Sequence, residues 1–153
     1  MLLNILIFLL SFFAMESVAW LAHKYLMHGF LWNLHEDHHT KDQYGFWEKN
    51  DYFFLIFATP GIICLFYGVM NAYNAFFFVG LGITVYGFAY FIVHDVFIHQ
   101  RIKWLRRSDS IYFRAIRKAH KVHHKRMTKE EGECFGMLWV PLKYFKEAKK
   151  AAV

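Results

Sequence analysis

The chain of 153 residues is 57% hydrophobic and 21% aromatic, yet it contains 18 lysine and arginine residues and has a formal net charge of +6. Apolar and basic residues at these levels must occupy separate regions, which excludes an ordinary soluble domain and favours a membrane protein. Nucleic acid is not an expected partner, because membrane topology accounts for the positive charge.

Three apolar segments are long enough to cross a bilayer as helices, since about 20 helical residues span a hydrocarbon core of roughly 30 Å. They are residues 2–21, 52–70 and 75–93. We predict an all-α integral membrane bundle with about three spans; a fourth, shallow or re-entrant segment is compatible with the sequence. Residues 1–153 are expected to form one domain, in which residues 23–51 and 94–153 build a cap.

Glu16 is the acidic residue inside the first apolar segment, seven residues before His23 and therefore on nearly the same helix face. Two interpretations stay open: the carboxyl group supports a histidine, or lipid keeps it protonated. A cleaved signal peptide is disfavoured for this segment, because the segment lacks a basic amino-terminal region.

The basic residues are confined to residues 24–51 and to the part of the chain after residue 100, and the connection 68–74 has none. Three crossings place both basic regions on one side of the membrane, and their positive charge predicts that this side is the cytoplasm. The run 143–150 is expected to be a short basic amphipathic helix that rests on lipid headgroups.

All ten histidines fall into four clusters that repeat one pattern in each half of the chain. The clusters are His23-x4-His28, His35-x2-His38-His39, His94-x4-His99 and His120-x2-His123-His124. Residues three and four apart share a helix face, so each triplet is expected to converge on one point. The x4 pairs lie roughly 140° apart on an ideal helix, so they need a helix end, a local unwinding or two different metals.

The number of histidines indicates a metal centre with more than one ion. Neutral imidazole binds zinc, iron, copper or nickel, and a zinc site needs only three or four protein ligands. Two metals that share eight to ten imidazoles suit a pair of irons that bind and reduce O2. The chain has one Glu-x-x-His spacing, Glu36 to His39, so a carboxylate-bridged site is not supported.

Several residues near the clusters have a functional and a structural interpretation. Asp95 either orients the imidazole of His94 from behind or faces lipid headgroups. The basic stretch Arg106, Arg107, Arg114, Arg117, Lys118 and Lys121 either contacts headgroups or docks an acidic electron donor. Gly80, Gly82 and Gly87 are expected to permit close helix contacts.

Two further strings accompany the histidine pattern, His94-Asp95-x3-His99-Gln100-Arg101 and Phe135-Gly136-x-Leu138-Trp139-x-Pro141. The pattern, these strings and the short length resemble bacterial β-carotene hydroxylases, which belong to the fatty acid hydroxylase and sterol desaturase superfamily of membrane non-haem di-iron enzymes. The resemblance covers nearly the whole chain.

This resemblance implies an oxidoreductase that inserts one oxygen atom of O2 into C3 of a β-ionone ring, converting β-carotene to β-cryptoxanthin and then zeaxanthin. It also implies two iron ions held by all ten histidines, a ferredoxin-type electron donor and a carotenoid that arrives from the lipid bilayer. The expected location is the cytoplasmic membrane of a bacterium. Zinc is expected to replace iron readily during purification.

Two classes of alternative remain open. In the first, the same site acts on a fatty acyl chain, a sterol or another carotenoid position, as a hydroxylase, ketolase or desaturase. In the second, the chain is a membrane metal-binding or bis-histidine haem protein without enzymatic activity, although histidines gathered at one interface do not suit axial haem ligands.

Overall fold

The computed structural model describes residues 1–40, 46–105, 109–125, 127–130 and 132–151, and every regular element within them is a helix. The longest elements are α1 (Leu2–Leu21), α3 (Tyr52–Met70) and α4 (Ala75–Phe91). The shorter ones are α2 (Trp32–His39), α5 (Ile111–His123), α6 (Leu142–Lys150), the π-helices η1 (Ala22–Phe30) and η3 (Ile92–Ile98), and the 3-10 turn η2 (Lys49–Asp51). The predicted all-helical class is confirmed.

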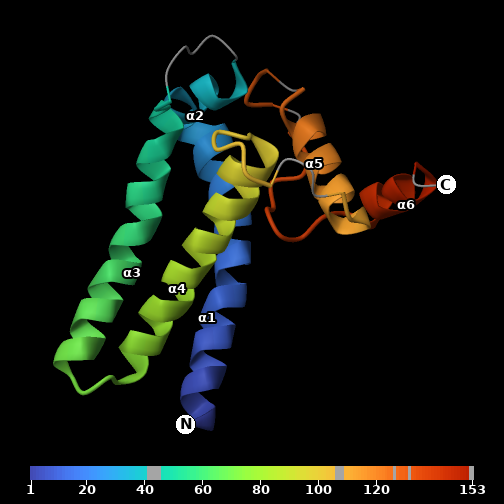
Figure 1. The fold of residues 1–153 in the computed structure, drawn as a ribbon. Helices are drawn as coiled ribbons and strands as arrows, with labels where there is room; N and C mark the ends of the chain where they lie inside the picture. The colour runs from blue at the N-terminus through green and yellow to red at the C-terminus, as the bar shows by residue number, and fades with distance from the viewer. Residues whose placement is uncertain (41–45, 106–108, 126, 131, 152–153) are drawn as a thin grey trace.

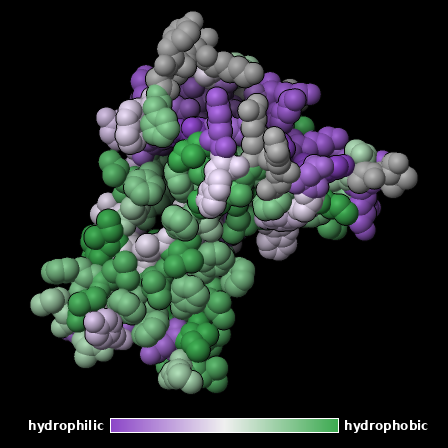
Figure 2. Space-filling model, viewed as in Figure 1, coloured by the Kyte–Doolittle hydropathy of each residue, from purple (hydrophilic) through white to green (hydrophobic). Residues whose placement is uncertain are grey.

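Three continuous helices are long and apolar enough to cross a membrane: Leu2–Phe30, Lys49–Met70 and Ala75–Ile98. The predicted segments 2–21 and 52–70 agree with α1 and α3, and the predicted segment 75–93 ends two residues past α4. The first and third helices both continue beyond their predicted ends, through η1 and η3. Many of their apolar side chains are exposed; the exposed fraction is 70% for Phe66 and 66% for Phe88. Figure 2 shows this hydrophobic surface over the long helices and hydrophilic residues gathered at the other end of the molecule. Such a surface fits contact with lipid chains.

Helix α4 packs against both α1 and α3 (Figure 1). Two glycines permit this close packing, since an added Cβ would lie 2.6 Å from the Leu65 nitrogen at Gly80 and 2.7 Å from the Ser11 Cβ at Gly82. The prediction was wrong for Gly87, where an added Cβ would meet nothing within 4 Å.

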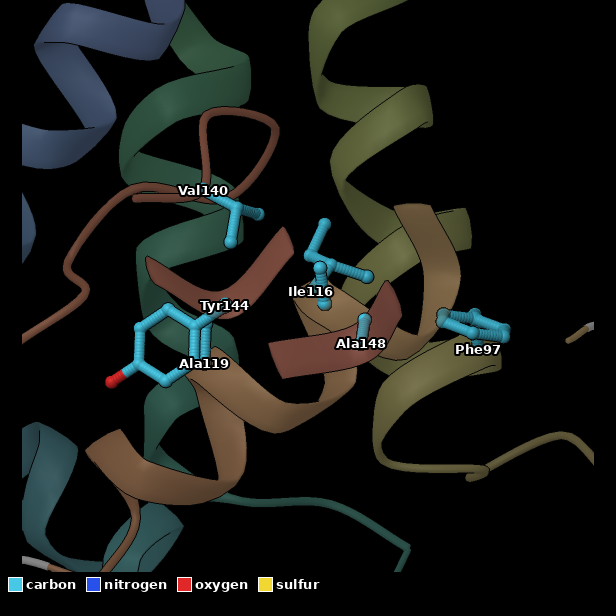
Figure 3. Packing of buried hydrophobic residues seen from close by; sticks show 7 residues of the cluster. Phe97, Ile116, Ala119, Val140, Tyr144 and Ala148 are labelled. Atoms are coloured by element: carbon cyan, nitrogen blue, oxygen red, sulfur yellow. The ribbon is translucent and has the colours of Figure 1, made fainter. Parts of the chain in front are cut away.

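The cap has its own small apolar core between α5, α6 and the end of η3 (Figure 3). Phe97 and Ala115 are fully buried there, and Tyr144 and Ala148 of α6 pack onto α5. Tyr144 and Ala148 of α6 are therefore covered by protein, whereas Leu142 is exposed. The position of run 143–150 on headgroups stays a prediction. This core fixes α5, which contains His120 and His123 and is followed directly by His124, against the end of the third span.

Candidate metal centre

Helices η1 and η3 are π-helical continuations of the first and third spans. His23 and His28 lie on η1, and His94 lies on η3 with His99 directly after its end. In a π-helix the N–H of one residue bonds to the carbonyl five residues earlier, as the His99 N–H does with the His94 carbonyl at 2.9 Å. Residues five apart then share a face. The ring centroids of His94 and His99 are 4.5 Å apart and those of His23 and His28 are 5.2 Å apart. The x4 pairs were expected to need a helix end, a local unwinding or two different metals. The structure shows local unwinding.

Five buried histidines form what we call the first group. One ring nitrogen of each lies within 4.8 Å of those of the other four. The Nε2 atom of His35 is 3.1 Å from Nε2 of His23 and 3.2 Å from Nε2 of His39. The members are His23, His28, His35, His39 and His123.

Four further histidines have ring nitrogens within 4.8 Å of one another: His38, His94, His99 and His120. His124 joins them, because its Nε2 atom lies 2.8 Å from Nε2 of His120. We call these five the second group. The two groups adjoin each other where the rings of His39 and His124 stack with their centroids 4.6 Å apart. All ten histidines therefore belong to one of two adjacent groups of five.

The prediction that each triplet converges on one point was wrong. His35 and His39 belong to the first group, whereas His38 between them reaches the second. The triplet of α5 does the reverse: His120 and His124 belong to the second group and His123 crosses to the first. Consecutive helical residues point about 100° apart, so two adjacent histidines cannot readily face one ion.

The outward-facing Nδ1 atoms of several of these rings are held by hydrogen bonds. His23 Nδ1–H donates to the Phe135 carbonyl at 3.0 Å, and His123 Nδ1–H donates to the Glu133 carbonyl at 2.8 Å. Further Nδ1–H groups face acceptors in the same way, in the pairs His28 with the Lys129 carbonyl, His35 with Asn50, His38 with Glu48 and His94 with Asp95. Each such bond fixes the tautomer that leaves the Nε2 lone pair free to bind a metal.

Burial keeps the imidazoles in the neutral form that binds metals. Burial, together with the neighbouring imidazoles, lowers the pKa of His35 to about 2 and the pKa of His123 to about 3. The pKa values of His38 and His120 are lowered for the same reasons. Five ring nitrogens of the first group, and four of the second, lie within 4.8 Å of one another; their lone pairs repel unless a cation lies between them, so each group fits a metal ion.

Asp95 and Arg101 support the second group from behind. The Asp95 Oδ2 atom accepts from His94 Nδ1 at 3.2 Å, and its Oδ1 atom pairs with Arg101 Nη1 at 2.8 Å. Arg101 also binds both carboxylate oxygens of Asp51, at 2.7 and 2.8 Å, and these bonds raise its pKa. The guanidinium thus ties the start of α3 to the end of η3.

Glu16 has contacts that neither of its two interpretations anticipated. Its Oε1 atom accepts the backbone N–H groups of Met137, Leu138 and Trp139, each at 2.9 Å, and its Oε2 atom accepts the hydroxyl of Tyr86 at 2.8 Å. Four donors match an ionised carboxylate, which only accepts hydrogen bonds. Glu16 therefore joins α1 to α4 and to the segment that precedes α6.

Comparison with known proteins agrees with this geometry. Residues 8–143 match the sequence profile of the fatty acid hydroxylase family. A β-carotene hydroxylase of Pseudescherichia vulneris is 39% identical over 91% of this chain and 78% of its own length. One of Pantoea ananas is 36% identical over 90% and 78% of the two chains.

The chain belongs to the fatty acid hydroxylase family. The resemblance inferred from the histidine spacing is confirmed, and membership makes the chain an oxidoreductase of the hydroxylating type. The similarity extends to plants: β-carotene 3-hydroxylase 1, a chloroplastic protein of Arabidopsis thaliana, is 43% identical over 72% of this chain and 36% of its own length. No solved structure matches the chain.

Sequence reasoning missed several residues that complete the site of this family member. Glu48 and Asn50 hold histidines of α2, and the carbonyl groups of Lys129, Glu133 and Phe135 hold histidines of η1 and α5. Only Arg101 and Phe135 had a signal, since both occur in the strings that carried the resemblance. Backbone acceptors leave no trace in side-chain identity, so spacing alone could not find the others.

Proposed function

We propose that this chain hydroxylates C3 of the β-ionone ring of β-carotene, giving β-cryptoxanthin and zeaxanthin, at two iron ions held by the ten histidines. The whole chain, residues 1–153, acts as one domain. The observation that carries the proposal is the gathering of ten imidazoles into two groups of five at the end of the membrane-spanning helices. β-Carotene is proposed as the substrate because relatives that match about nine-tenths of the chain are β-carotene hydroxylases.

The metal ions and the protein are proposed to have separate roles in the reaction. Two irons held by these histidines would supply an oxidant made from O2, which no amino-acid side chain can provide for an unactivated C–H bond. The chain holds the imidazoles neutral and oriented, through burial and through the outward Nδ1–H bonds. Asp95 orients His94 in the second group, and Phe135 covers three rings of the first group and excludes water from them.

The carotenoid is proposed to enter from the bilayer beside α1. Two half-open grooves of about 420 and 480 Å³ share Glu16, Ser17 and Trp139 in their walls. Other wall residues are apolar: Phe12, Phe13, Leu138, Val140, Leu142 and Phe145 in the first groove. The ring of Phe135 contacts both Trp20 in the second groove and His23 in the first group. An apolar polyene can therefore approach the histidines along walls that are mostly apolar.

The histidine groups are proposed to face the cytoplasm, where reduced ferredoxin supplies the electrons, because the basic residues lie on that side of the spans. A cytoplasm-active reporter fused after α6 should be active, and the same reporter inserted in the turn 71–74 should be inactive. The reverse pattern would contradict this orientation.

An acidic donor is proposed to dock on the basic face of α5. Lys121 and Lys118 lie there, and Lys118 is paired with Glu147 at 2.6 Å. Arg114 pairs with Asp109, and Arg117 lies over the ring of Phe97. Arg106 and Arg107, which were predicted to belong to this face, lie outside the described residues.

A second candidate has a specific observation in its favour, because the matching family is named for fatty acid hydroxylation. In that case the same two metal sites act on an acyl chain, or on a sterol or another carotenoid position. The grooves beside α1 would accept any of these apolar substrates, so the substrate must be tested directly.

The test is pigment analysis, by chromatography with mass detection, of β-carotene-producing bacteria that express the chain or its His123→Ala or His124→Ala variant. Hydroxylated β-carotene is expected with the intact chain and not with either variant. If the intact protein reaches the membrane with two irons and no new pigment forms, the carotenoid substrate is wrong and acyl or sterol substrates come next. A Soret band in the purified protein would instead indicate haem.

A further inference from the structure

The segment between α5 and α6 forms one wall of the first histidine group. Its Phe135 carbonyl accepts from His23 Nδ1, and its Glu133 carbonyl accepts from His123 Nδ1. The Phe135 ring lies 5.4 Å from the ring centroids of both these histidines and 5.2 Å from that of His28. Residues 132–141, the described part of the segment that leads into α6, have no regular secondary structure, so other contacts must hold them in register with the histidines.

Glu16 is the side chain that holds it. One carboxylate oxygen receives three consecutive N–H groups, from residues 137–139, directly after the residues that contact the histidines. Three N–H dipoles that converge on one oxygen form an anion-binding concavity, which favours negative charge over a neutral acceptor. The second oxygen is fixed by Tyr86 of α4. The carboxylate therefore anchors the segment to two membrane-spanning helices.

The fit between Glu16 and the segment is close. A Cβ at Gly136 would lie 3.0 Å from the Glu16 Oε1 atom and 3.1 Å from the Trp139 carbonyl oxygen. The backbone can follow this path around the carboxylate because residue 136 has no side chain. A displacement of the Glu16 carboxylate would therefore shift the backbone at Phe135, the residue next to Gly136.

The second histidine group is supported by other residues. Its outward acceptors are Glu48 for His38 and Asp95 for His94, and neither belongs to the segment that Glu16 holds. Glu16 makes no hydrogen bond to a histidine in the described part of the structure; its bonds go to Tyr86 and to backbone N–H groups. Replacement of Glu16 should therefore change metal binding by the first group only.

We propose that Glu16 is a positioning residue for the first histidine group: its carboxylate holds residues 133–139 so that their carbonyls orient His23 and His123. This inference rests on the proposed binding of one metal by each group. Removal of a residue that orients metal ligands typically costs roughly 10- to 100-fold in metal affinity. The loss should fall on the first group alone, and glutamine should restore part of it, since its oxygen still accepts N–H groups but carries no charge.

The experiment titrates purified, metal-free protein with cobalt(II), whose absorption reports each site, and measures bound metal per chain after competition with a chelator. The chains compared are wild type, Glu16→Ala, Glu16→Gln and, as a matched control at an exposed ion pair, Glu147→Gln. Wild type and the control should bind two equivalents tightly. Glu16→Ala should bind one tightly and one roughly 10- to 100-fold more weakly, and Glu16→Gln should lie between.

Two results would overturn the assignment: two sites of unchanged affinity in Glu16→Ala, or an equal weakening of both sites. Spectra of the double variant Glu16→Ala/His123→Ala identify the affected site. His123→Ala already removes the metal of the first group, so adding Glu16→Ala should change metal binding little. Failure of the wild type to bind two equivalents would instead refute the proposed metal centre itself, so the two failures are distinguishable.

Discussion

Alanine at position 123 is expected to remove one of the two metal ions, the one held by the first group, and to leave the other bound. His123 is fully buried, and its ring lies 4.5 Å from that of His23 and 4.8 Å from that of His39. The adjacent His124 faces the second group, where its Nε2 atom is 2.8 Å from that of His120. Two neighbouring residues on one helix should therefore affect different metals.

The measurement is metal content per chain, by mass spectrometry, for His123→Ala and its matched neighbour His124→Ala, together with the rate of product formation. Each variant should retain about one metal, and each should lose at least about 100-fold in activity, because loss of a ligand exceeds the roughly 10- to 100-fold effect of an outer contact.

The decisive control combines positions across the two halves of the chain. His123→Ala with His39→Ala should deplete the same site, whereas His123→Ala with His38→Ala should deplete both, because His38 reaches the second group. If His38→Ala and His39→Ala instead deplete one common site, the crossed arrangement is wrong and each triplet does serve a single ion.

Alanine at Asp95 is expected to weaken the metal held by the second group and to lower activity by roughly 10- to 100-fold. The carboxylate fixes His94 through one oxygen and Arg101 through the other. Its removal frees the imidazole to rotate and leaves the guanidinium, whose pKa is raised by its carboxylate partners, with one fewer counter-ion. The Asp95→Asn variant should lose less, because its amide oxygen can still accept from His94.

Asp109 provides the matched control for this prediction, since it also pairs with an arginine, Arg114, but its side chain is 62% exposed. An exposed pair contributes little, so Asp109→Ala should retain metal content and activity. Metal titration and product formation, measured on all three variants, check the expectation. Unchanged affinity of the second group in Asp95→Ala would mean that the hydrogen bond to His94 does not orient a ligand.

The membrane-spanning helices and the histidine pattern could be read from the sequence because both depend on local order. An apolar run of about 20 residues has few alternatives to a spanning helix, and the predicted segments 2–21 and 52–70 agree with α1 and α3. Histidines four apart on a helix necessarily share a face, so the pairs His35 with His39 and His120 with His124 were implied by spacing. The family, too, was recognisable from these positions.

Which histidine meets which group was decided only by the tertiary structure. His38 and His39 diverge on α2, and only the packing of α2 and α5 against η1 and η3 brings a partner to each. The contacts that support the histidines join residues far apart in the sequence. Glu16 accepts hydrogen bonds from residues 137–139, more than 120 positions away, and His23 donates one to the Phe135 carbonyl. Sequence periodicity describes one helix at a time, whereas a metal site of ten ligands depends on how four helices face one another, which side-chain packing and hydrogen bonds between distant segments determine.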